Sequence, residues 1–155
     1  MASIQSTVIE MLHHVFPQHA NPAGTLYGGW MMNWIVTAGN LAASRLTKKP
    51  LLLASIEDLF FLQPVRIGDV VTVKAMVEYA GKTSLEVEAV VFCKPLNGEE
   101  KLCTRARMSF VSIDVHGKPM PIEQHIEPAD EKEMKICQYA KEIREGRLAR
   151  IAQRR

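Results

Sequence analysis

The fold is decided by the stretch His19-Ala20-Asn21-Pro22-Ala23-Gly24-Thr25-Leu26-Tyr27-Gly28-Gly29-Trp30 and by the apolar run, Trp30 to Ala43, that continues it. This run carries no charge and is rich in alanine, methionine and leucine, which favours a helix over a strand. We expect the helix to extend from about Leu26 to Leu46, because Lys48-Lys49-Pro50 then ends it. A helix that is apolar on nearly all sides should be buried on most of them.

Two adjacent glycines, Gly28 and Gly29, stand where this helix begins. Without a Cβ atom they let another group approach the backbone closely. The first N–H groups of a helix have no partner within it and lie at the positive end of its dipole, so they can hold an anion or an oxygen that is becoming one. The helix start is therefore a candidate site, although such glycines also serve close packing between a helix and a sheet.

Alternating apolar and polar residues after the helix predict a run of antiparallel strands. The four expected segments are Leu51 to Leu62, Gly68 to Ala80, Thr83 to Cys93 and Lys101 to Ile113. Before the helix, Ile4 to Phe16 alternates loosely and reads as a first strand, with a helix left open as the alternative. The order of strand, long buried helix and strands predicts an α+β domain with its helices on one face of a single sheet.

The composition shifts at Pro128, where Pro128-Ala129-Asp130-Glu131 is typical of a helix start. From Lys141 to the end there are six basic and two acidic residues. Basic residues near a helix C-terminus are the ordinary expectation, and contact with a phosphorylated ligand or a partner subunit is the sharper alternative. We therefore divide the chain into one domain, 1–127, and a basic helical extension, 128–155.

Bulk properties exclude several classes of function. A net charge of +2 is too small to argue for a nucleic-acid partner. The longest apolar stretch is interrupted by Asn33, Thr37 and Asn40, which argues against a membrane span. No targeting segment is expected at the N-terminus. Three cysteines without metal-binding spacing predict free thiols in a reducing compartment, so we expect a cytoplasmic protein without a metal site.

Several motifs follow one another in a specific order, and together they carry a family resemblance. They are Asn21-x-x-Gly24-x-x-x-Gly28-Gly29, Phe61-Leu62-Gln63-Pro64-Val65 before Ile67-Gly68-Asp69-Val70, Gly81-Lys82-Thr83-Ser84, and Phe110-Val111-Ser112-Ile113-Asp114. Over about residues 5 to 122 the chain resembles the hotdog-fold acyl-CoA thioesterases, specifically the cytosolic acyl-CoA hydrolase group that includes the bacterial YciA-type enzymes. The resemblance implies a long central helix wrapped by an antiparallel sheet, with the C-terminal helix as an addition.

The resemblance also implies an activity and an assembly. The activity is hydrolysis of fatty acyl-CoA to free acid and coenzyme A, with no cofactor beyond the CoA of the substrate. The assembly is a homodimer joined through the strand after the helix, commonly built further into a hexameric trimer of dimers. A hotdog dehydratase is disfavoured, because it needs a histidine with an acidic partner and only His19 lies near the glycines.

The same resemblance implies roles for particular residues. The backbone N–H groups of Gly28 and Gly29 polarise the thioester carbonyl. Asn21 places the carbonyl or the water, unless it only holds an Asx turn. The turn Gly81-Lys82-Thr83-Ser84 contacts the nucleotide or pantetheine of CoA, unless it is an ordinary hairpin turn.

The sequence departs from the family at the carboxylate, which lies in the helix two turns after the glycines. That position is Val36 here, next to Thr37, and neither residue serves as a conventional base or carboxylate nucleophile. The acid then comes from elsewhere, or water is activated more weakly, or the protein binds acyl-CoA without hydrolysing it.

Polar residues recur at helical spacing as Asn33, Thr37, Asn40 and Ser44. This stripe either lines a wet cleft against another subunit, where Thr37 or Asn40 orients a water, or is an exposed helix edge.

Two acids, Glu57 and Asp58, stand side by side in the strand after the helix, where we expect them to point to opposite faces. Glu57 matches an acid of the family and Asp58 does not, so Asp58 is the candidate substitute acid that reaches a partner's helix.

Arg105 and Arg107 alternate in the last strand. We prefer cross-strand charge pairs for them over contacts with adenosine phosphates.

Overall fold

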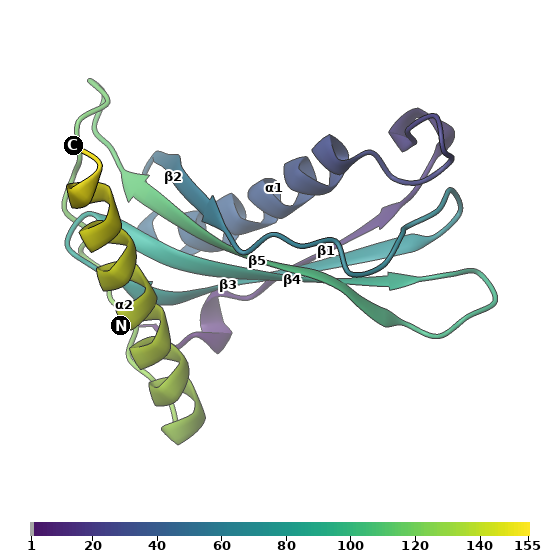
Figure 1. Cartoon of the computed structure of the whole chain (residues 1–155). Helices are drawn as coiled ribbons and strands as arrows, with labels where there is room; N and C mark the ends of the chain where they lie inside the picture. The colour runs from purple at the N-terminus through teal and green to yellow at the C-terminus, as the bar shows by residue number, and fades with distance from the viewer. Residues whose placement is uncertain (1) are drawn as a thin grey trace.

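Residues 2–155 are described by a computed structural model, in which one antiparallel sheet of five strands lies between two long helices (Figure 1). The strand order across the sheet is β1-β3-β4-β5-β2. The bounds are Ile9–His14 for β1, Leu51–Glu57 for β2, Val70–Ala80 for β3, Ser84–Lys94 for β4 and Lys101–Ser112 for β5. The alternating segments therefore do form strands, and β2 is left as one edge of the sheet.

Helix α1, Gly28–Thr47, crosses one face of this sheet and carries the core of the molecule. Its buried residues pack against the alternate apolar positions of the strands, such as Val73, Val87 and Met108. It ends at Thr47, because the next residue, Lys48, has a left-handed φ of 54° that breaks the helical path. The expected helix, from about Leu26 to Leu46, is confirmed.

Two strands are shorter in the structure than the sequence pattern predicts. Residues 5–7 form a short 3-10 helix, and the Thr7 hydroxyl oxygen accepts a hydrogen bond from the Val77 amide at 2.9 Å. Strand β1 consequently begins only at Ile9. Strand β2 ends at Glu57 because Asp58 has a left-handed φ of 56°, so the expected strand to Leu62 is wrong in its last five residues.

Helix α2, Glu131–Gln153, lies across the opposite face of the sheet (Figure 1). Its N-cap is Asp130, whose carboxylate accepts a hydrogen bond from the Glu133 amide at 2.8 Å. In β4, Leu85 and Val87 belong to the core under α1, whereas Glu86 between them bonds to Arg147 of α2. The expectation that the helices share one face is therefore wrong, since successive side chains of a strand point to opposite faces.

An ionic layer lies on the α2 side of the sheet, and the pairs of Arg147 and Arg150 join α2 to the strands. Arg147 is paired with Glu86 and, at 2.6 Å, with Glu57. Beside them, Arg107 is bonded to Glu78 at 2.7 Å and to Glu88 at 3.1 Å. The remaining pairs are Arg105 with Glu88 and Arg150 with Glu57. The charge-pair interpretation of Arg105 and Arg107 is thus confirmed.

Glu78 gives this ionic layer a predicted pH dependence. Burial raises the pKa of Glu78 from 4.5 to about 7, and the Arg107 guanidinium only partly opposes the shift. A carboxyl whose pKa is higher in the folded state adds stability that is complete below about pH 4.5 and is lost as the pH rises through about 7. We expect Glu78→Gln to remove a decline in unfolding free energy on the order of 2 kcal/mol between about pH 5 and pH 8.

The measurement is urea unfolding of both proteins at a series of pH values and at one fixed protein concentration. The difference between the variant and the wild type isolates Glu78 from the other titrating groups. Equal slopes against pH in the two proteins would show that Glu78 keeps an ordinary pKa.

Candidate active site

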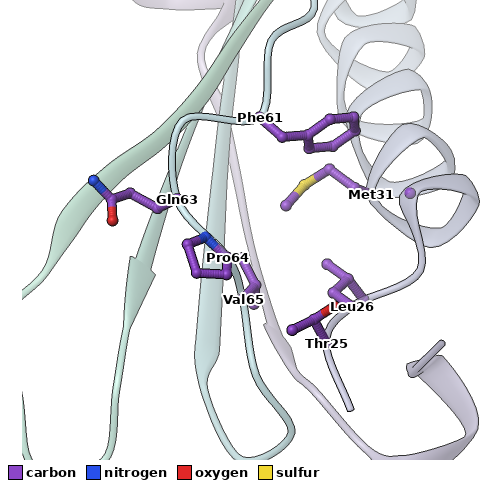
Figure 2. A pocket seen from close by; sticks show the side chains of 8 residues that line it. Thr25, Leu26, Met31, Phe61, Gln63, Pro64 and Val65 are labelled. Carbon is purple, nitrogen blue, oxygen red and sulfur yellow. The ribbon is translucent and has the colours of Figure 1, made fainter. Parts of the chain in front are cut away.

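An apolar cleft opens where α1 begins (Figure 2). It has a volume of about 320 Å³ and lies between residues 25–31 and the loop 61–65. The Leu26 amide donates to the Val65 carbonyl at 2.7 Å and holds the two segments together. In Figure 2 the side chains of Met31, Leu26 and Phe61 border the space, whereas the amide of Gln63 points away from it. The cleft is therefore suited to an apolar ligand group.

Gly28 places the start of α1 at this cleft. A Cβ atom on Gly28 would lie 3.6 Å from the Phe61 ring, so the glycine keeps the backbone open toward the cleft. The first helical amide to find an acceptor is that of Trp30, which donates to the Tyr27 carbonyl at 3.0 Å. Within residues 2–155 the amides of Gly28 and Gly29 have no acceptor, which leaves them available as hydrogen-bond donors.

Gly29 borders a different hollow, of about 240 Å³, together with Tyr27, Trp30 and Asn33. The two glycines therefore face different surroundings, and Gly28 is the one that lines the apolar cleft. A role of either amide in polarising a carbonyl stays a prediction.

Asn21 holds the loop that precedes the cleft. Its side-chain oxygen accepts hydrogen bonds from the amides of Ala23 at 3.0 Å and Thr25 at 3.2 Å, and its Nδ2 donates to the Thr25 hydroxyl at 2.9 Å. These bonds form the Asx turn that the sequence left open as an alternative. Asn21 thus fixes Thr25, which lines the cleft, and a direct contact of Asn21 with substrate stays a prediction.

The polar stripe of α1 lies away from the core. Asn33, Thr37 and Asn40 are exposed, and Ser44 is half-buried. Val36, which stands at the position of the family's carboxylate, is half-buried against the core. In the single chain the stripe is thus an exposed edge, and it is free to face a partner.

Asp58 lies on the α2 side of the sheet. It lines a hollow of about 170 Å³ with Glu88, Arg105, Arg107 and other residues, none of which borders the apolar cleft. Glu57 is on the same side, since its carboxylate bonds to Arg147. The expectation that Glu57 and Asp58 point to opposite faces is wrong, because the strand ends between them. Asp58 as a substitute acid stays a prediction, and within one chain it does not reach the cleft.

The turn Gly81-Lys82-Thr83-Ser84 lies at the opposite end of α1 from Gly28. The Thr83 carbonyl accepts a hydrogen bond from the Ser112 amide, and Ser112 pairs with Leu51 just after α1 ends. A helix of 20 residues is about 30 Å long. One chain therefore does not bring the predicted CoA-binding turn and the predicted catalytic glycines together.

His19 is used structurally. Its Nδ1 accepts a hydrogen bond from the Phe16 amide at 3.0 Å, and its ring packs edge-on against Trp30 and Trp34. His13 stacks on Trp34 with ring centres 4.3 Å apart, and burial lowers the pKa of His13. The sequence pattern predicted neither this aromatic cluster nor Phe61 as a wall of the cleft.

Within residues 2–155 no group of three metal-ligating side chains is present, and no helix is long and apolar enough to span a membrane.

Comparisons with known proteins agree on one family. Residues 23–100 match the model of the Thioesterase superfamily. A Bacillus subtilis protein named as an uncharacterized acyl-CoA thioester hydrolase, YkhA, is 31% identical over 77% of this chain and 70% of its own length.

Two solved structures are similar along almost the whole chain. An acyl-CoA hydrolase from Staphylococcus aureus, solved with butyryl-CoA and CoA, has a TM-score of 0.87 and 29% identity and covers 97% of this chain and 92% of its own. A hexameric acyl-CoA thioesterase has a TM-score of 0.89 and 28% identity, with coverage of 97% and 96%.

Proposed function

The chain belongs to the thioesterase superfamily, and we propose that it is an acyl-CoA thioester hydrolase of hotdog fold that releases a free acid and coenzyme A. The observation that carries this proposal is the apolar cleft beside unpaired amides at the start of α1. The cleft offers a lining for an acyl chain, and the amides offer donors for the oxygen of a thioester.

In the proposed reaction, water attacks the thioester carbonyl carbon and the C–S bond breaks. The oxygen gains negative charge in the tetrahedral state, where the amide hydrogens of Gly28 and Gly29 stabilise it. The departing thiolate takes up the proton that the attacking water has lost and becomes the free thiol of CoA. Without a carboxylate at Val36, we assign orientation of the water to Thr37 of the exposed stripe. Removal of its proton by Asp58 then requires a subunit of a neighbouring dimer, because pairing of two β2 strands sets the partner's Asp58 at the end of α1 away from Gly28.

An oligomer completes this site in our proposal. Strand β2 is an edge strand, and Leu52 and Leu53 on it are 53% and 41% exposed. Antiparallel pairing of two β2 strands sets the Leu51 end of one copy beside the Glu57 end of the other. The turn that begins at Gly81 in one subunit then approaches the cleft of its partner. A hexameric relative supports assembly of such dimers into a trimer of dimers.

We further propose that residues 1–127 form the thioesterase domain and that 128–155 are an extension. The last strand ends at Ser112, and α2 begins at Glu131, which supports this division. A cytoplasmic location is supported by the free thiols of Cys93, Cys103 and Cys137.

The test is a thiol-release assay with acyl-CoA substrates of increasing chain length, run beside a CoA-binding measurement. We expect one free thiol per acyl-CoA consumed, at rates that depend on chain length because the acyl group occupies the cleft. Binding of acyl-CoA without thiol release at any length would contradict the proposal and would identify a non-catalytic acyl-CoA-binding protein.

A further inference from the structure

Three arginines of α2 recur at intervals of three residues and contact the sheet or its turns. Arg147 is paired with Glu57 and Glu86, and Arg150 is paired with Glu57. Arg144, one turn earlier, contacts the turn between β3 and β4 instead, where its Nε donates to the Ser84 hydroxyl at 3.3 Å. Figure 1 shows α2 crossing the sheet at this end.

Arg144 differs from its two neighbours because no carboxylate neutralises it within residues 2–155. Its side chain is half-buried, and its guanidinium lies 3.5 Å from the position of a Cβ atom on Gly81. The carboxylate on the same strand face, Glu86, is already bonded to Arg147. The terminal N–H groups of Arg144 therefore carry a positive charge that is partly withdrawn from water and has no counter-ion in the chain.

The turn beside Arg144 has used its acceptors and offers donors. The carbonyls of Lys82 and Thr83 accept hydrogen bonds from the amides of Ile122 at 2.8 Å and Ser112 at 2.9 Å. What stays available is the exposed ammonium of Lys82 and the hydroxyls of Thr83 and Ser84. A guanidinium, an ammonium and hydroxyls around one turn match the chemistry of a phosphate group.

We propose that Arg144 of α2 completes a phosphate-binding site with the turn 81–84 and holds the nucleotide phosphates of the CoA thioester. This inference rests on the proposed function and extends it to the C-terminal extension, which then supplies a substrate contact. In the proposed dimer the site serves the cleft of the partner subunit.

The test compares Arg144→Ala with the wild type on two substrates that share one acyl group, an acyl-CoA and the corresponding acyl-pantetheine, which lacks the nucleotide. We expect the KM for acyl-CoA to rise about tenfold or more, a loss of about 1.4 kcal/mol or more. The kcat and all constants for acyl-pantetheine should stay within about twofold of wild type. Arg144→Lys should recover part of the loss, because lysine keeps the positive charge but lacks the planar guanidinium that binds a phosphate through two N–H groups.

The matched control is Arg154→Ala, which removes an exposed arginine from the end of the same helix. An unchanged KM for acyl-CoA in Arg144→Ala overturns the inference, because Arg144 then makes no contact with the nucleotide. An equal loss of kcat/KM on both substrates also overturns it, because Arg144 then has a structural role. If the wild type hydrolyses neither substrate, the proposed function fails, and direct titration with CoA decides the inference. Weaker CoA binding by Arg144→Ala than by Arg154→Ala supports it, and equal binding overturns it.

Discussion

Replacement of Arg147 by methionine is expected to lower the free energy of unfolding by about 3 kcal/mol or more. Arg147 is the partner of Glu86, whose side chain is 0% exposed, and its own side chain is only 9% exposed. Methionine fills similar space but leaves the Glu86 carboxylate buried without a counter-charge. Burial already raises the pKa of Glu86 while the Arg147 guanidinium opposes the rise, so the variant should lose more stability as the pH increases.

Urea unfolding at fixed protein concentration measures the effect, because the stability of an oligomer depends on concentration. Arg150→Met is the control, since its pair with Glu57 is 63% exposed on the arginine side and should cost less than about 1 kcal/mol. The double variant Arg147→Met with Glu86→Leu should recover much of the loss, because no lone charge is then buried. Equal losses of unfolding free energy in Arg147→Met and Arg150→Met would contradict a stabilising role of the buried pair between Arg147 and Glu86.

Much of the sheet was predictable because its strands alternate regularly. Strands β3, β4 and β5 lie within about two residues of the expected segments, since Val71, Val73 and their equivalents alternate with polar residues. Helix α1 was predictable for a similar reason, as its uncharged run has helical composition. These elements are set by local pattern, and local pattern can be read from one sequence.

The errors arose where tertiary contacts override local pattern. Residues 5–7 could have continued β1, but the Thr7 hydroxyl oxygen satisfies the Val77 amide, and the chain turns. Asp58 follows an apolar strand without a glycine or proline to mark its end, yet adopts a left-handed φ. Nothing local distinguishes these residues from strand residues.

The face occupied by α2 depended on pairs that are far apart in the sequence. Glu86 lies between apolar neighbours, and such positions ordinarily face water. Its partner Arg147 lies 61 residues further on. The basic composition of that segment is evident from the sequence, but its contact with β4 is not. Likewise, the glycines and the turn at Gly81 were identified separately, but their positions at opposite ends of α1 follow only from the folded chain.

Gly28→Val is expected to reduce kcat/KM for acyl-CoA about 100-fold, or about 3 kcal/mol of transition-state stabilisation. The valine Cβ would lie 3.6 Å from the Phe61 ring, an ordinary contact, so the fold should accept it. Its two methyl groups would extend beyond the Cβ into the cleft that Gly28 lines and would crowd the amide there. Substrate would then lose both acyl contacts and the donors for the developing oxyanion.

The helix itself should not suffer, because valine has a higher helix propensity than glycine. The thiol-release assay therefore has to be paired with an unfolding curve, and the midpoint of Gly28→Val should match that of the wild type. Gly146→Val makes the same change in α2, where the nearest atom to the new Cβ is the Arg150 guanidinium at 3.7 Å, and it should leave the rate unchanged. Full activity in Gly28→Val would place the thioester away from the cleft at the start of α1, because the valine narrows the cleft beside the Gly28 amide.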